Sequence, residues 1–139
     1  MNLSIEWLKA AYLDLENIKY IVNVEYLSSV TAFHSQQAIE KSFKSLVQYK
    51  HGKTKNQHDL LKLYESISEL IIIEEADRLD RIDTLNQLLY IDSRYPGDMG
   101  LLPYGKPTLE DAQEFYEFAQ DIFNQVCTIL NIDPEEVKK

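Results

Sequence analysis

Apolar residues recur every three or four positions over most of the chain, with polar residues filling the positions between them. This period is typical of helices that bury one face and expose the other. It predicts helices over about residues 3–24, 29–50, 58–70 and 74–91, and a last helix that begins after Thr108. Thr108 has the short hydroxyl side chain that favours the N-cap position of a helix. The first proline is Pro96, so little in the first half of the chain would interrupt a helix.

Short polar connections separate most of these helices, for example "HGKTKNQ" at residues 51–57. Because short connections make consecutive helices antiparallel neighbours, we expect an all-α fold, an antiparallel up-and-down bundle of about five helices. The bundle would be one domain over residues 1–131, followed by a frayed tail over 132–139. The longer segment 91–107 holds three of the four prolines and three of the four glycines. Strict alternation would place it at the same end of the bundle as residues 51–57.

Two polar residues lie where the apolar faces should be continuous. Asp14 lies in the middle of the apolar stripe of the first helix. A buried carboxylate without a partner costs several kcal/mol, so a cation should meet it. If the first two helices form an antiparallel hairpin, His34 and Lys41 lie one turn either side of the level of Asp14, and we expect Lys41 to be the partner. Gln36 also falls on an apolar stripe and needs polar partners. These four residues predict a structural polar lock, and a catalytic carboxylate is the alternative for Asp14.

The charge of the chain is unevenly distributed. The formal net charge is −9, which argues against nonspecific binding of nucleic acid over the whole surface. Residues 41–62, however, contain six lysines and a single acidic residue, Asp59. This region is either a solvated helix end or a patch that binds an anion or a partner.

The chain lacks the usual motifs for metals, cofactors and membranes. The three histidines are not spaced as HxxxH or HExxH, no glycine-rich phosphate loop occurs, and Cys127 is the single cysteine. We therefore expect no metal, no cofactor and no catalytic residue. The longest apolar run, "LIII" at residues 70–73, is too short to span a bilayer. With no secretion signal at the N-terminus, we expect a cytoplasmic protein that does not associate with a membrane.

Four short motifs together resemble the HEPN domain family, helical domains of prokaryotes and higher eukaryotes that are associated with nucleotide binding. The motifs are Ala11, Asp14 and Leu15 in the first helix, "FHSQQAIEKSFKSLV" at 33–47, "HDLLKL" at 58–63, and "SRYP" at 93–96 before a last helix led by "DA". The resemblance covers about residues 7–125. It implies a bundle of about five helices that dimerises, often beside a minimal nucleotidyltransferase and in some cases as part of a toxin–antitoxin pair.

The ribonuclease branch of this family carries an arginine followed, after four to six residues, by a histidine. No arginine of this chain has a histidine after it, because the last histidine is His58 and the arginines are Arg78, Arg81 and Arg94. Lys53 and His58 have a comparable spacing, but a lysine lacks the planar fork of a guanidinium. The resemblance therefore favours a non-catalytic interaction module that binds a minimal nucleotidyltransferase, a nucleotide or RNA. The alternative is a ribonuclease toxin with an irregular active site of Lys53, His58 and Arg94.

The two basic segments suggest where an anion would bind. If residues 51–57 and 91–107 lie at one end of the bundle, their cations and aromatic rings would surround one rim. The candidate residues for binding a nucleotide or another anion are Lys50, Lys53, Lys55, His58, Arg94 and Tyr95. Tyr95 would provide a stacking surface for a base. A structural alternative is that Arg94 and Tyr95 only hold their loop against the bundle.

Overall fold

The structure, a computed structural model, describes residues 2–54, 56–73, 80–86 and 107–138. Those residues form helices, turns and loops without a strand, so the predicted all-α helical bundle is confirmed. The described elements are α1 (Asn2–Lys19), the 3-10 helix η1 (Glu25–Leu27), α2 (Ser28–His51), α3 (Leu60–Ile67), a helical stretch over 80–86, α5 (Leu109–Ile129) and α6 (Pro134–Val137). The first helix ends earlier than expected, and a turn over residues 20–23 leads into η1.

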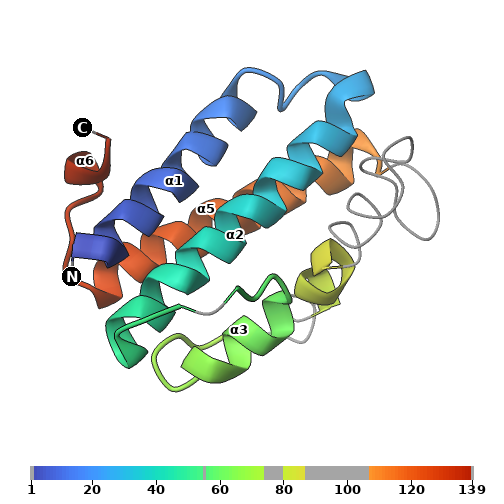
Figure 1. The fold of residues 1–139 in the computed structure, drawn as a ribbon. Helices are drawn as coiled ribbons and strands as arrows, with labels where there is room; N and C mark the ends of the chain where they lie inside the picture. The colour runs from blue at the N-terminus through green and yellow to red at the C-terminus, as the bar shows by residue number, and fades with distance from the viewer. Residues whose placement is uncertain (1, 55, 74–79, 87–106, 139) are drawn as a thin grey trace.

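Helix α2 lies at the centre of the bundle, with α1 and α5 beside it and α3 across its second half (Figure 1). Helix α1 runs antiparallel to α2, as the hairpin reading expects, but α5 runs in the same direction as α2 (Figure 1). The hydroxyl of Ser28 donates to the carbonyl of Pro107 at 2.7 Å, which ties the starts of α2 and α5 together. Pro107 therefore lies beside the start of α2, at the opposite end of the bundle from residues 51–57. The predicted position of segment 91–107 itself falls mostly on residues 87–106, which lie outside the described residues.

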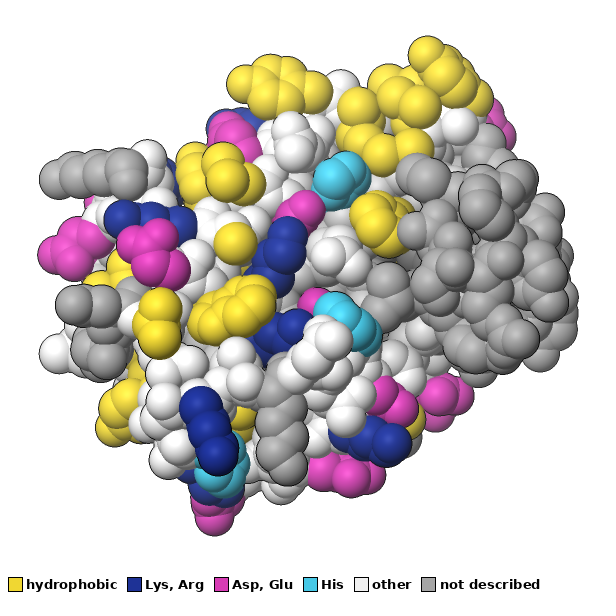
Figure 2. Space-filling view, viewed as in Figure 1, with side chains coloured by type: hydrophobic (Ala, Val, Ile, Leu, Met, Phe, Trp, Pro, Cys, Tyr) yellow, Lys and Arg dark blue, Asp and Glu magenta, His cyan; other side chains and the backbone are white. Residues whose placement is uncertain are grey.

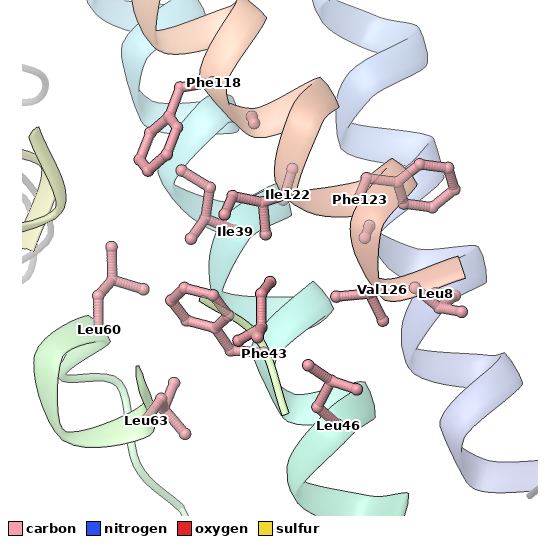
Figure 3. Close-up of a cluster of buried hydrophobic side chains, with 14 of the residues drawn as sticks. Leu8, Ile39, Phe43, Leu46, Leu60, Leu63, Phe118, Ile122, Phe123 and Val126 are labelled. Atoms are coloured by element: carbon pink, nitrogen blue, oxygen red, sulfur yellow. The ribbon is translucent and has the colours of Figure 1, made fainter. Parts of the chain in front are cut away.

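The core forms where α1, α3 and α5 direct apolar side chains toward α2 (Figure 3). Ile71, Ile82 and Leu85, which follow α3 in the chain, are also buried in it. The buried side chains labelled in Figure 3 are Leu8, Ile39, Phe43, Leu46, Leu60, Leu63, Phe118, Ile122, Phe123 and Val126. The faces of α2 that contact its neighbours also carry small residues. Ser35 and Ser42 are fully buried, and each hydroxyl donates to the carbonyl four residues earlier, to Thr31 at 2.8 Å and Ala38 at 2.7 Å. Their polar atoms are therefore satisfied inside α2 itself.

The ends of the helices are fixed by local caps. Helix α2 stops at Gly52, whose φ of 77° places it in the left-handed region that favours glycine, and whose N–H donates to Gln48 at 2.9 Å. The carboxylate of Asp59 accepts from the N–H groups of Leu61 and Lys62 and so caps α3. Thr108 caps α5 as the sequence predicts, because its side chain accepts from Asp111 N–H at 3.0 Å. These caps set where the loop over residues 51–57 leaves α2 and enters α3.

The C-terminal segment differs from the expected frayed tail. Residues 134–137 form the short helix α6, capped by Asp133, and Val137 is buried in the core at 2% exposure. Asn131, with a φ of 56°, reverses the chain after α5 so that α6 folds back toward the start of α1 (Figure 1). The sequence of a proline followed by two glutamates is typical of a solvent-exposed tail. Proline is also well suited to the first turn of a helix, and the two glutamates interact favourably with the positive end of the helix dipole. Val137, together with Ile132 packed against the core and Lys138 over the Tyr12 ring, holds the segment on the bundle.

Candidate functional site

Asp14 is held between a lysine and a histidine of α2. Its carboxylate contacts Lys41 Nζ at 2.6 Å through one oxygen and His34 Nδ1 at 2.8 Å through the other. Because His34 and Lys41 are two helical turns apart, they lie on one face of α2, directly opposite Asp14 on the antiparallel α1. The side chain of Asp14 is 9% exposed, whereas those of His34 and Lys41 are about one quarter exposed. The carboxylate is therefore covered by its partners, which reach the surface.

Gln36 does not belong to this cluster. It is fully buried, and its Oε1 accepts from Gln37 Nε2 at 2.6 Å. Its own Nε2 has no hydrogen-bonding partner in the part of the chain that the structure describes. The sequence correctly indicated a buried amide, but the structure places it one turn before Glu40 rather than beside Asp14.

A second buried carboxylate, Glu40, was missed by the sequence reading. Its side chain is 5% exposed and contacts Lys44 Nζ at 3.3 Å and His58 Nδ1 at 3.2 Å. Lys44 is also buried, and its ammonium lies 5.1 Å from the centre of the Trp7 ring, a cation–π contact. Gln36, Glu40 and Lys44 are spaced four residues apart, so they form one polar stripe along α2. Because α2 is buried on most sides, this stripe is the sequence signal that could have indicated a buried Glu40.

These two clusters form one polar seam, defined here as Asp14, His34, Glu40, Lys41, Lys44 and His58. Figure 2 shows histidine and lysine side chains in a row across the middle of this face, with small areas of acidic atoms between them. Each buried carboxylate has one lysine and one histidine beside it. Since the two lysines balance the two carboxylates, the seam adds little net charge while the histidines are neutral. This arrangement links α1 and α2 with His58, which lies just before α3.

A separate pocket of about 350 Å³ lies between the end of α2 and α3. This basic pocket is lined by Val47, His51, Lys53, Gln57, Lys62, Leu63 and Ser66. No carboxylate is among these lining residues. Lys53 and Lys62 have no ion-pair partner among the described residues, so both ammonium groups are available to an anion. The imidazole of His51 approaches the carbonyl of Ser66 at 3.3 Å and stays at the pocket wall.

The residues of the predicted rim are divided between these sites. Lys53 lines the basic pocket, whereas His58 contacts Glu40 in the polar seam. Lys50 pairs with Glu69 and donates to the carbonyl of Ser66 at 2.9 Å, so it is already engaged. The hydrogen bond from Lys50 holds the pKa of the Glu69 carboxyl below its usual value. Of the remaining three predicted residues, none can be placed: Lys55, Arg94 and Tyr95 lie outside the described residues.

The described residues contain no group of three or more histidine, cysteine or acidic side chains arranged to hold a metal ion. Cys127 is 1% exposed, and burial, with a smaller effect of Asp133, raises the pKa of its thiol to about 11. A thiol with that pKa stays protonated at neutral pH and is a poor nucleophile.

Replacing Asp14 with alanine should test the polar lock. The substitution leaves Lys41 and His34 without their shared partner, so we expect the free energy of unfolding to fall by about 2–4 kcal/mol. Combining Asp14→Ala with Lys41→Met should recover part of that loss. Chemical denaturation monitored by circular dichroism measures both changes. As a control, Glu6→Ala breaks an exposed pair with Lys9 and should change stability by less than about 0.5 kcal/mol. A single Asp14→Ala variant as stable as the wild type would contradict the lock.

Comparison with known proteins agrees with the four motifs. The sequence model of the family described as "HEPN domain" matches residues 5–130, nearly the whole chain. No curated protein and no solved structure matches. Every helix of the described residues is too short or too polar to cross a membrane. Three of the four motifs meet in the structure, since Asp14, the residues of 33–47 and His58 all contribute to the polar seam. The chain belongs to the HEPN domain family, which covers nucleotide-binding and ribonuclease roles.

Proposed function

We propose that the protein is a non-catalytic HEPN interaction module, a homodimer that binds the phosphate groups of a nucleotide in the basic pocket and serves a minimal nucleotidyltransferase as its partner. The basic pocket is the observation that carries the proposal. Among the described residues, it joins two lysines without an ion-pair partner and an imidazole, with no carboxylate in the lining.

The charge of the whole molecule makes such a local cluster necessary. A net charge of −9 repels nucleotides at long range, so affinity must come from cations that contact the phosphate directly. Lys53 and Lys62 provide two point charges, and Gln57 Nε2 adds a neutral donor. The carbonyl end of α2 lies beside the pocket, and its partial negative charge opposes an anion. We therefore expect weak binding, with a Kd on the order of 1 mM.

Titration of the protein with ATP and with inorganic phosphate tests the pocket. Backbone amide shifts should saturate for residues 47–66, and added salt should weaken binding because exposed charges are screened. Lys53→Ala should weaken binding about tenfold, since it removes one charge-assisted hydrogen bond. Lys9→Ala changes the net charge equally at a distant site on α1 and is the matched control. Shifts that appear only outside residues 47–66, or equal effects of the two substitutions, would contradict phosphate binding in the basic pocket.

The proposed lack of catalysis rests on the missing arginine-to-histidine pair. His58, the last histidine, has one ring nitrogen against the buried carboxylate of Glu40, and Lys53 lines a different site. The irregular ribonuclease site of Lys53, His58 and Arg94 would require these three side chains to contact one phosphate. Lys53 and His58 instead belong to two different sites.

Purified protein should leave single-stranded RNA intact. We expect the same result for wild type and His58→Ala in a gel assay with a labelled oligonucleotide, because neither has the residues for cleavage. Copurifying nucleases would cleave equally in both samples. Cleavage by the wild type that is lost in His58→Ala would support the ribonuclease alternative.

The proposed dimer forms through an apolar face at the edge of α1 and η1. Leu13, Tyr20 and Tyr26 are exposed by 63%, 78% and 76%, and Val30 and Phe33 lie half-buried on the adjoining side of α2. Figure 2 shows apolar side chains gathered along this edge. Exposed apolar area of this kind is unusual on a monomer and typical of an interface. HEPN domains commonly dimerise, and a twofold axis through this face would bury it on both copies.

Charged substitutions in this face should dissociate the dimer. Leu13→Glu and Tyr26→Glu would each place a carboxylate in both halves of the interface, and we expect a shift to monomer in light scattering at micromolar concentration. Ile72→Glu is the control, because Ile72 is 65% exposed beyond the end of α3, away from this face. A wild-type monomer, or a dimer that survives Leu13→Glu and Tyr26→Glu, would contradict this interface.

A further inference from the structure

A second pocket, of about 220 Å³, lies between α1, α5 and α6. It shares no lining residue with the basic pocket. Aromatic rings of Tyr12, Tyr116 and Phe123 form its walls, and the Tyr12 and Phe123 rings lie 6.4 Å apart at an angle of 39°. We propose that this aromatic pocket binds a planar heteroaromatic ring of the nucleobase class, independently of the phosphate site proposed above.

The side chains that would recognise such a ring through hydrogen bonds are those of Gln120 and Asn124. Both line the pocket, and because they are one turn apart on α5 they lie on the same face of the helix. Neither side-chain amide has a hydrogen-bonding partner within the described residues. An amide offers a donor and an acceptor side by side, which matches the alternating donors and acceptors on the edge of a base. The flat aromatic walls provide the stacking surface that every base can use.

The charged groups of the pocket are already engaged with one another. Glu16 binds Lys19 at 3.0 Å and accepts a hydrogen bond from the Tyr12 phenol, which raises the pKa of Tyr12. Lys138 binds Glu135 at 2.9 Å, and its ammonium lies 5.8 Å from the centre of the Tyr12 ring. The groups left for a ligand are therefore mainly neutral amides and rings. This composition favours the base itself and makes a phosphate group unnecessary for binding.

Helix α6 completes the pocket. Pro134 and Lys138 close one side, and the buried Val137 between them anchors the segment to the core. Burial also raises the pKa of Tyr116, consistent with a ring that is sheltered from water. The volume is below the 300–1,000 Å³ typical of pockets for drug-sized ligands. A single ring system fits this space, with a ribose left at the open side.

Titration with adenosine, uridine and inorganic phosphate would test the proposal on the full chain. We expect adenosine to shift the side-chain NH₂ signals of Gln120 and Asn124 and the backbone amides of residues 12–19 and 116–124. Inorganic phosphate should leave these signals unchanged and shift residues 47–66 instead. The two ligands thus report on the two sites separately, so either proposal can fail without the other. Uridine has a smaller ring than adenosine and stacks over a smaller area, so it should bind more weakly than adenosine.

Substitution of the amides is the second test. Gln120→Leu combined with Asn124→Leu keeps the side-chain size but removes both hydrogen-bonding groups, so adenosine binding should weaken about tenfold or more. Asn17→Leu changes an exposed amide on α1 outside the pocket and should bind as the wild type does. Unchanged NH₂ signals at millimolar adenosine would overturn the proposal. Adenosine shifts confined to residues 47–66, or equal affinity of the double variant and Asn17→Leu, would also overturn it.

Discussion

The burial of α2 is the constraint on which the rest of the structure depends. A helix with neighbours on three sides has no large solvent face, so most of the polar groups that it buries need partners inside the protein. The hydroxyls of Ser35 and Ser42 bond to carbonyls of α2 itself, and the charged residues pair with Asp14 of α1 and with His58 before α3. Among the described residues of α2, the Nε2 of Gln36 and the hydroxyl of Thr31 are buried without such a partner. Asp14 and Glu40 are acceptable only because each meets a lysine and a histidine. The same contacts that satisfy these charges fix the register of α1 and the start of α3.

This arrangement keeps the paired charges of the polar seam apart from the groups that we propose to bind ligands. In the polar seam the cations are used to neutralise buried carboxylates, so little attraction remains for an external anion. Within the described part of the chain, the lysines of the basic pocket have no such partners, and the side-chain amides of Gln120 and Asn124 in the aromatic pocket form no hydrogen bond. Unsatisfied groups at concave surfaces are better candidates for recognition than charges that are already paired. A polar motif in the sequence is therefore informative about function only after its internal partners are known.

The helices and the partners of Asp14 could be predicted from the sequence, because helical periodicity and the geometry of a short hairpin are local properties. Glu40 could not be identified as buried, since a glutamate four residues before a lysine is equally typical of a solvated helix face. The direction of α5 relative to α2 could not be predicted from local sequence rules either. The chain between these two helices is long enough for α5 to run parallel or antiparallel to α2. His58 and Lys53 are close in sequence, but side-chain direction sends them to different sites. Helix α6 has four residues and buries one of them, Val137. A single apolar residue in the sequence does not distinguish such a helix from a solvated tail.

The bond between Ser28 and Pro107 joins the starts of two parallel helices that are separated by more than fifty residues of chain. The entropy lost in closing such a connection grows only with the logarithm of its length. The pairing of α2 with α5 therefore sets no tight limit on how long the intervening chain is. Insertions and deletions there act on stability through the core contacts of α3 and of the described residues that follow it, which include Ile71, Ile73, Ile82 and Leu85. The hydrogen bond between Ser28 and Pro107 itself fixes only the two ends of the connection.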